Sequence, residues 1–211
     1  MLPDGAWPGL HDFGRWIARW LYRPVYRIRV HGLSRVPPAG PVVLVANHST
    51  LIEPPVIFGA LPRRSVFLVK SELVTGPLGW GLRRIGQLPV RRGEADRGAL
   101  TAAIGVLRAG GLLGVFPEGT RGSGDVERAE QGAAWLVRAT GAVVLPVATR
   151  GTLRPAGSGR RFRPKLDVLV GEPFSLTVQR GRSGLGEATE EIRRRLADLV
   201  HQLDEQRAAS I

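Results

Sequence analysis

The chain has 211 residues, of which 43% are hydrophobic, and a formal net charge of +12. This length predicts one domain with a substantial core, and the lack of cysteine excludes disulfides, thiolate metal sites and a cysteine nucleophile. Nearly all the positive charge is arginine, with Lys70 and Lys165 the only lysines, and such a charge predicts partners rich in phosphate or an anionic membrane.

The first predicted element is a helix from Pro8 to Arg23, which Pro24 ends. Its apolar residues fall on one face at helical spacing, and arginines fall on the opposite face. The apolar face consists of Leu10, Phe13, Ile17, Trp20 and Leu21. Two interpretations stay open, a helix lying in the lipid interface and an ordinary helix packed on the core. We therefore separate residues 1–24, a candidate membrane-interface anchor, from a single domain over residues 25–211.

Membrane-spanning and secretory signals are not evident in the sequence. No apolar run approaches the ~20 residues that cross a bilayer. The N-terminus has no basic region followed by an apolar core and a small-residue cleavage site. We therefore expect a cytoplasmic protein that binds the inner face of the cell membrane peripherally.

Beyond residue 24, short apolar runs alternate with amphipathic stretches of about a dozen residues. Strands are predicted at 25–33, 42–46, 65–69, 87–90, 112–116, 142–148 and 165–170. Helices are predicted at 54–61, 78–85, 96–108, 127–140 and 185–206, with residues 181–186 as a flexible connector. This alternation predicts an α/β fold, a mostly parallel central sheet covered by helices on both faces.

The stretch that follows the apolar run 42–46 carries the first candidate site. The predicted strand stops at a polar pair, Asn47 and His48, and Glu53 follows five residues after the histidine. Open α/β sheets bind ligands at the carboxyl ends of their strands. A carboxylate beside an imidazole can fix its tautomer and stabilise its protonated form, which makes the histidine a general base. The alternative is a histidine that only caps a loop.

A second polar turn follows the apolar run 112–116, from Glu118 through Gly119 and Thr120 to Arg121. Glycine permits a tight backbone path that turns amide donors toward an anion. The planar guanidinium of Arg121 matches a phosphate. Glu118 would orient that guanidinium or bind a substrate hydroxyl.

Three further cations follow predicted strands. Lys70 follows the strand 65–69, and Arg91 and Arg92 follow the strand 87–90. In a parallel sheet Lys70, Arg92 and Arg121 would meet at the edge that holds His48, whereas Arg91 is interpreted as a solvated surface charge. The other histidines, His11, His31 and His201, are interpreted as surface or partly packed, and no cluster has metal-ligand spacing.

Four ordered segments of the chain resemble the four motifs of the glycerolipid acyltransferases, and the 1-acylglycerol-3-phosphate acyltransferase family in particular. The segments are His48 to Glu53, Gly86 to Arg92, Phe116 to Arg121 and Val144 to Val147. Any one of them would be a weak signal, but four in the same order are specific. The family's lysine before a Glu-Leu pair corresponds to Lys70, which precedes Glu72 and Leu73.

The resemblance implies transfer of a fatty acyl group from acyl-CoA or acyl carrier protein to the hydroxyl of a lysophosphatidate-like glycerolipid. In that reaction His48 would be the general base and Glu53 would orient it. Lys70, Arg92, Glu118, Gly119, Thr120 and Arg121 would bind the substrate phosphate. No cofactor or metal is implied, and the expected partners are the acyl thioester, the lysolipid and an anionic membrane surface.

One residue departs from the family pattern of histidine, four residues and aspartate, because Glu53 stands at the aspartate position. A displacement of ~1 Å can cost on the order of 100-fold in rate. From the sequence, Glu53→Asp is expected to keep or raise activity, and a loss of that size would indicate a backbone built for glutamate.

Other functions remain open at this stage. The acceptor is either lysophosphatidate or another lysolipid or polyol, and because of Glu53 the chain is alternatively a lipid binder with little turnover. A nucleic-acid binder would use the charge and the basic segment 160–165. We expect no nucleic-acid partner, because the basic residues are scattered and no nucleic-acid module is visible.

Overall fold

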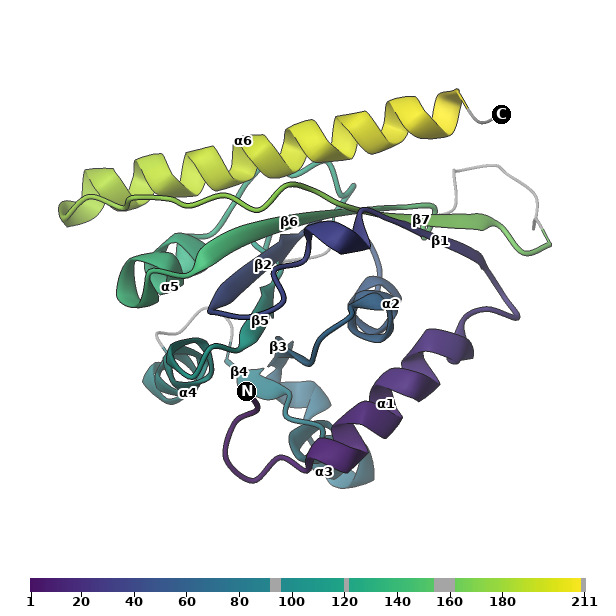
Figure 1. Ribbon diagram of the computed structural model, residues 1–211, viewed down its shortest axis with the longest axis horizontal. Helices are drawn as coiled ribbons and strands as arrows, with labels where there is room; N and C mark the ends of the chain where they lie inside the picture. The colour runs from purple at the N-terminus through teal and green to yellow at the C-terminus, as the bar shows by residue number, and fades with distance from the viewer. Residues whose placement is uncertain (92–95, 120–121, 154–161, 210–211) are drawn as a thin grey trace.

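A seven-stranded sheet with helices on both faces forms the body of the chain (Figure 1). The computed structural model describes residues 1–91, 96–119, 122–153 and 162–209. The strands are β1 (Arg27–His31), β2 (Val42–Ala46), β3 (Ser65–Lys70), β4 (Leu88–Val90), β5 (Leu112–Val115), β6 (Val143–Arg150) and β7 (Lys165–Val170). Their order is β1-β7-β6-β2-β5-β3-β4, and every neighbouring pair is parallel except β6 and β7. The predicted α/β class and mostly parallel sheet are confirmed.

The helices divide between the two faces of this sheet (Figure 1). They are α1 (Pro8–Leu21), α2 (Glu53–Ala60), α3 (Gly76–Arg84), α4 (Arg97–Arg108), α5 (Gly132–Thr140) and α6 (Gly181–Ala208). Helices α4, α5 and α6 cover one face, and α1 and α2 cover the other.

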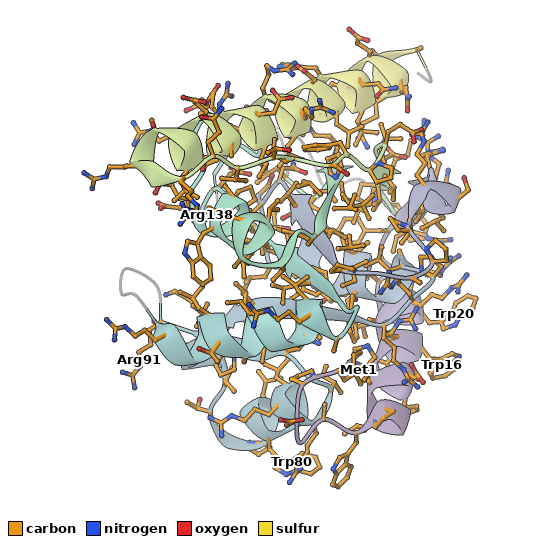
Figure 2. All side chains as sticks on the ribbon, turned by 60° about the vertical axis from the view of Figure 1, so that its left-hand side comes forward. Met1, Trp16, Trp20, Trp80, Arg91 and Arg138 are labelled. Atoms are coloured by element: carbon orange, nitrogen blue, oxygen red, sulfur yellow. The ribbon has the colours of Figure 1, made fainter. Side chains whose placement is uncertain are left out.

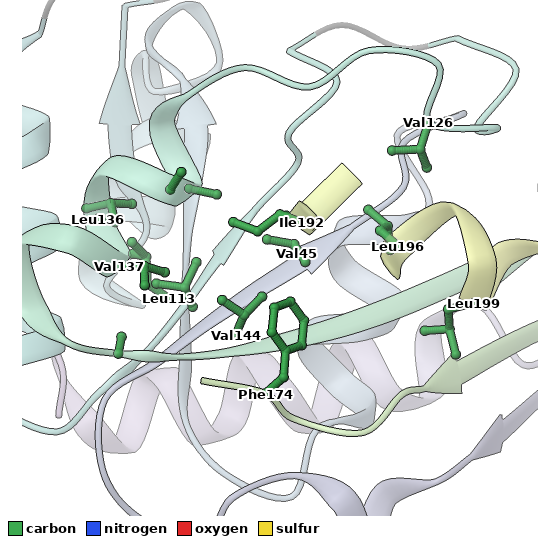
Figure 3. Close-up of a cluster of buried hydrophobic side chains, with 14 of the residues drawn as sticks. Val45, Leu113, Val126, Leu136, Val137, Val144, Phe174, Ile192, Leu196 and Leu199 are labelled. Atoms are coloured by element: carbon green, nitrogen blue, oxygen red, sulfur yellow. The ribbon is translucent and has the colours of Figure 1, made fainter. Parts of the chain in front are cut away.

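The all-apolar β2 strand supplies both cores because successive side chains of a strand point to opposite faces. Val43 and Val45 pack with residues of α4, α5 and α6, and Figure 3 shows Val45 beside Ile192 of α6. Val42, Leu44 and Ala46 pack with residues of α2 and α1 on the other face. All five β2 residues are fully buried, which anchors the loop that follows.

The helix boundaries that differ most from the sequence-based prediction are the starts of α5 and α6. Helix α6 begins at Gly181, so the predicted connector over residues 181–186 is wrong. Gly184 lies so close to Gln179 that a Cβ would meet its carbonyl oxygen at 2.6 Å, so close packing outweighs low helix propensity there. Helix α5 begins at Gly132, five residues later than predicted. The segment before α5 is held by contacts with the rest of the chain and is not helical. Val126 is buried in the core, and the backbone N–H of Glu130 donates to the Pro117 carbonyl oxygen.

Helix α1 packs through a different face from its most apolar one. His11 and Ala18 are its buried residues, and α1 lies against α2 closely enough that a Cβ on Gly59 would meet the Arg19 backbone. Interpreting His11 as a surface or partly packed residue was wrong, since it is fully buried with Nδ1 2.6 Å from the Ile85 carbonyl oxygen.

The apolar face of α1 is therefore open to solvent. The exposed large side chains on it are Phe13, Trp16, Ile17, Trp20 and Leu21, and Trp16 and Trp20 project outward from the helix (Figure 2). Of the two interpretations left open by the sequence, a core-facing role does not apply to this face. Among the described residues, no helix has both the length and the apolar composition to cross a membrane.

Candidate active site

The first candidate residues meet where β2 ends and α2 begins. Nδ1 of His48 lies 3.1 Å from Oε2 of Glu53, and the same oxygen accepts from the backbone N–H groups of Ser49 and Thr50 at 2.8 and 2.9 Å. Glu53 is the first residue of α2 and is fully buried, and His48 is only 4% exposed. The loop thus wraps around the carboxylate, and the histidine–carboxylate pair predicted from the sequence is present.

A third residue, Thr152, completes the surroundings of this carboxylate. Its hydroxyl donates to Oε1 of Glu53 at a distance of 2.5 Å. Thr152 lies in the segment after β6, 99 positions further along the chain than Glu53. The Glu53 carboxylate therefore has an imidazole and two amides on Oε2, and the Thr152 hydroxyl with the more distant Thr50 hydroxyl, at 3.5 Å, on Oε1. Sequence analysis missed Thr152, and the only signal for it was its place after a strand of the same sheet.

This arrangement fixes which ring nitrogen of His48 can act as a base. With Nδ1 facing the carboxylate, the proton of the neutral ring sits on Nδ1, and the lone pair of Nε2 is left to accept a proton. The ring also packs on Phe116 at the end of β5, with centroids 4.5 Å apart and planes 33° from each other. Packing and the carboxylate together hold the imidazole in one orientation.

The turn after β5 lies directly against His48. Glu118 accepts from the His48 backbone N–H at 2.7 Å, and Gly122 donates to the His48 carbonyl oxygen at 3.1 Å. Gly119 has φ +69°, the left-handed conformation that favours glycine. Partial burial raises the pKa of the Glu118 carboxyl, and the bond from the His48 N–H partly offsets this rise.

Asn47 ties the two loops to β6. It is fully buried, its amide nitrogen donates to the carbonyl oxygens of Gly124 and Thr149, and its amide oxygen accepts from the N–H and hydroxyl of Thr149. A buried amide with its donors and acceptor all paired is rigid. Asn47 was noted in the sequence only as a polar residue beside His48, and no spacing rule predicts its role.

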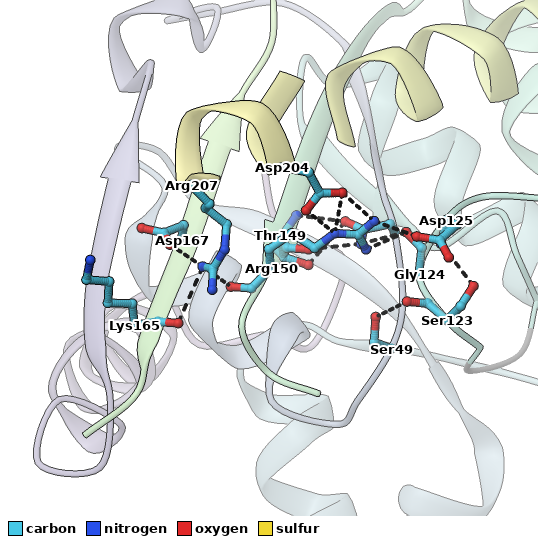
Figure 4. Close-up of polar contacts among 11 residues, drawn as sticks. Ser49, Ser123, Gly124, Asp125, Thr149, Arg150, Lys165, Asp167, Asp204 and Arg207 are labelled. Carbon is cyan, nitrogen blue, oxygen red and sulfur yellow. Dashed lines mark hydrogen bonds and ion pairs between the residues drawn. The ribbon is translucent and has the colours of Figure 1, made fainter. Parts of the chain in front are cut away.

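A charged cluster at the end of β6 holds the same loop from the other side (Figure 4). Arg150 forms a two-nitrogen ion pair with Asp204 of α6, and it also donates to Asp125 and to the Gly124 carbonyl oxygen. Arg207 of α6 contacts Asp167 of β7 through a single nitrogen, Nη1. Asp125 is thus an ion-pair partner of Arg150.

The structure describes only some of the predicted phosphate-binding residues. Arg92, Thr120 and Arg121 lie outside the described residues. Lys70 lies at the carboxyl end of β3, two strands from β2, and pairs with Glu72 at 3.3 Å, with its side chain about half exposed. It shares the sheet edge of His48 and does not contact it.

A groove of about 640 Å³ opens on the same side as Lys70. Its lining includes Ser71, Arg83, Arg91 and Arg97. Arg91, interpreted from the sequence as a surface charge, projects into solvent at this end of the molecule (Figure 2). The groove therefore adds cations that sequence analysis did not assign to a site.

The chain is similar to known acyltransferases in both sequence and structure. Residues 27–150 match the family model described as Acyltransferase. The chain is 26% identical over 184 residues to a 1-acyl-sn-glycerol-3-phosphate acyltransferase of Bacillus subtilis strain 168, covering 84% of this chain and 90% of that protein. It is 28% identical over 166 residues to an N-acylphosphatidylethanolamine synthase of Arabidopsis thaliana, covering 67% of this chain and 58% of that protein.

Among solved structures, the crystal structure of the 1-acyl-sn-glycerophosphate acyltransferase PlsC from Thermotoga maritima resembles the chain with a TM-score of 0.64. The two are 26% identical, and the match covers 90% of this chain and 78% of that one.

Proposed function

This chain belongs to the acyltransferase family, and from that premise we propose that it transfers a fatty acyl group from an acyl thioester to the hydroxyl of a lysophosphatidate-like glycerolipid. The observation that carries the proposal is the His48–Glu53 pair, held at the carboxyl edge of the sheet by donors on both carboxylate oxygens. The Bacillus and Thermotoga relatives are 1-acylglycerol-3-phosphate acyltransferases, and their reaction belongs to phospholipid synthesis.

In the proposed reaction His48 Nε2 removes the proton of the acceptor hydroxyl as its oxygen attacks the thioester carbonyl. The tetrahedral intermediate then collapses, the carbon–sulfur bond breaks, and the leaving thiolate takes the proton from His48. Glu53 stabilises the imidazolium between these two steps. The acyl group passes directly from thioester to hydroxyl, and no cofactor is needed.

The hydrogen bonds of the two loops exclude several backbone amides as donors to the oxyanion of the tetrahedral intermediate. The backbone N–H groups of Ser49 and Thr50 already donate to Glu53, that of His48 donates to Glu118, and that of Gly119 donates to Phe116. A donor committed to another oxygen does not stabilise developing charge without losing that bond. The amides of residues 48 to 50 and 119 therefore serve to position the catalytic pair, and the oxyanion donor is another group.

Lys70, Arg92 and Arg121 are proposed to hold the acceptor phosphate, together with Thr120. Glu118 is proposed to orient Arg121 or bind a substrate hydroxyl, and Gly119, whose N–H donates to Phe116, to shape the turn. The groove beside Lys70 supports a phosphate on the β3–β4 side, because its lining has three arginines, Arg83, Arg91 and Arg97, against one carboxylate, that of Asp96. Guanidinium groups match phosphate geometry with paired donors.

Glutamate at position 53 fits an active enzyme better than a lipid binder without turnover. The longer side chain does not pull the carboxylate away from the histidine, since the two are 3.1 Å apart. It also brings Oε1 within 2.5 Å of the Thr152 hydroxyl. The extra methylene is thus accommodated by the loops around it.

Membrane association is proposed to occur through the exposed face of α1, on the cytoplasmic side of the cell membrane. Tryptophan and phenylalanine side chains favour the interface between lipid and water, and this face carries Phe13, Trp16 and Trp20. Deleting residues 1–24 would uncover the core of α2, so substitution is a sharper test than deletion. Phe13→Ser, Trp16→Ser and Trp20→Ser together should reduce pelleting with anionic liposomes, whereas unchanged pelleting of the folded variant would exclude this role for α1.

The function is tested by supplying lysophosphatidate with an acyl thioester, either acyl-CoA or acylated acyl carrier protein. The diacyl product is followed by mass spectrometry. The proposal predicts thiol release matched by phosphatidate formation. If thiol were released only with a different lysolipid, that lysolipid would replace lysophosphatidate as the proposed acceptor. The absence of product with every acceptor and donor tested would refute the proposed reaction.

A further inference from the structure

A second groove, of about 680 Å³, lies between the end of α1, the start of β1 and the segment before β7. Its lining combines cationic and aromatic side chains from these elements. The residues are Trp20, Arg23, Tyr26, Arg27, Arg29, Phe162 and Arg163, with Pro24 and Ile28. None of them belongs to the four motifs of the catalytic site.

Three of the four guanidinium groups in this groove have no carboxylate partner among the described residues. Arg29 is neutralised by Asp167 at 2.6 Å, and Asp167 is also contacted by Arg207. Arg23, Arg27 and Arg163 form no ion pair within the described part of the chain, and all three are exposed. Three adjacent positive charges repel one another unless an anion lies between them, so the groove is suited to a phosphate.

The rim of the groove is apolar and exposed. Phe162 is 88% exposed, Trp20 50%, and the neighbouring Leu21 and Val25 are each 57% exposed. Trp20 and Leu21 also belong to the open apolar face of α1. A soluble phosphorylated ligand gains little from these side chains, whereas a lipid offers acyl chains to the rim and a phosphate to the arginines.

The groove lies on the same sheet edge as His48 but away from it. The start of β7 pairs antiparallel with the end of β6, and β1 runs parallel to β7, so Arg27 lies at the edge where β2 and β6 end. Three strand spacings separate β1 from β2, which is roughly 14 Å at about 4.8 Å per spacing. A lipid bound here would not occupy the reaction centre.

We propose that this groove binds the phosphate of an anionic membrane phospholipid through Arg23, Arg27 and Arg163, with Trp20 and Phe162 entering the interface beside it. The proposal builds on the membrane docking of α1 and adds a defined headgroup site to it. It fixes how the chain is turned on the membrane, with the His48 edge of the sheet next to the lipid surface.

The test measures vesicle binding, which does not depend on acyl transfer, by co-sedimentation with phosphatidylcholine alone or mixed with phosphatidate. The groove variant carries Arg23→Gln, Arg27→Gln and Arg163→Gln. The matched control carries Arg108→Gln, Arg180→Gln and Arg182→Gln, an equal change in charge at exposed positions at the end of α4 and around the start of α6. In Figure 1 the start of α6 lies on the left, whereas β1 and the end of α1, which line the groove, lie on the right.

The groove variant is expected to lose phosphatidate-dependent binding by on the order of 100-fold, from about fivefold per arginine near an anionic surface. The control should lose at most a few-fold. Because Arg163 also donates to the Arg23 carbonyl oxygen, Arg27→Glu alone provides a second variant, and it too should weaken phosphatidate-dependent binding.

Three outcomes would overturn the proposal. Equal loss in the groove variant and the control would mean that net charge, not this groove, attracts the membrane. Unchanged phosphatidate binding in Arg27→Glu and in the triple variant would mean that the groove holds no headgroup. A raised KM for acyl-CoA with unchanged vesicle binding would assign the groove to the soluble donor instead.

Discussion

The contact between Thr152 and Glu53 gives a sharp test of how the catalytic pair is held. Thr152→Val removes the hydroxyl that donates to Oε1 at 2.5 Å and keeps a side chain of similar shape. Oε2 keeps its contacts with His48 and the two amides, but the carboxylate loses its only described partner outside the 48–53 loop. The buried carboxylate can then rotate, and the imidazole is oriented less firmly.

The size of the effect follows from the chemistry of that bond. A hydrogen bond to a charged group contributes about 1.5–3 kcal/mol. Each 1.36 kcal/mol of lost transition-state stabilisation lowers the rate tenfold. If the whole free energy of this hydrogen bond were lost from the transition state, kcat would fall by roughly 10- to 150-fold. KM for the acyl donor should change little, because Thr152 acts through Glu53 and is not proposed to touch substrate.

The assay is steady-state thiol release from acyl-CoA with lysophosphatidate. Thr152→Ser keeps a hydroxyl and should restore most of kcat. Thr101→Val makes the same chemical change at an exposed position of α4 and should leave kcat unchanged. An unchanged kcat in Thr152→Val, or an equal loss in Thr152→Val and Thr152→Ser, would refute the positioning role of this hydroxyl.

Two further substitutions probe the same loops. Glu53→Asp shortens a side chain that reaches both His48 and Thr152. The structure therefore reverses the expectation from the sequence and predicts a loss of up to about 100-fold in kcat. A kcat equal to that of the native chain would show that the loop readjusts to the shorter side chain. Glu118→Gln keeps an acceptor for the His48 N–H but removes a carboxyl whose pKa burial raises. A group with a raised folded pKa contributes stability that is present below its unfolded value of 4.5 and is lost as pH rises through the folded value. The variant should therefore melt at a higher temperature than the native chain at neutral pH, and the gap should shrink as pH falls to 4; a gap independent of pH would contradict the burial of this carboxyl.

The fold was predictable because its strands are short apolar runs with clear ends. The 42–46 run is buried on both faces, and a strand of that kind has no competing helical pattern. The connector predicted at residues 181–186 failed because glycine usually marks a flexible segment, whereas here Gly184 permits close packing against Gln179. Such contacts depend on the tertiary structure and leave no periodic signal.

The site was predictable where its residues are close in sequence, as His48 and Glu53 are, or lie in a recognisable motif after a strand, as Glu118 does. His48 and Glu53 are five residues apart, and the spacing alone suggested their contact. Thr152 reaches Glu53 from 99 positions away, and Arg150, the last residue of β6, reaches Gly124 from 26 positions away. Neither residue lies in one of the four motifs that drew attention to the other site residues. The outward face of α1 was likewise left open by the sequence, because an amphipathic helix looks the same whether its apolar face meets a core or a membrane.

The central claim is that His48 removes the proton of the acceptor hydroxyl. Its most direct test is thiol release from acyl-CoA with lysophosphatidate by the native chain and by His48→Ala, after thermal unfolding has shown that the variant is folded. General-base catalysis contributes about 10²- to 10⁴-fold, so the variant should release thiol at or near the background rate. A folded His48→Ala variant that turns over within a few-fold of the native chain would contradict the mechanism.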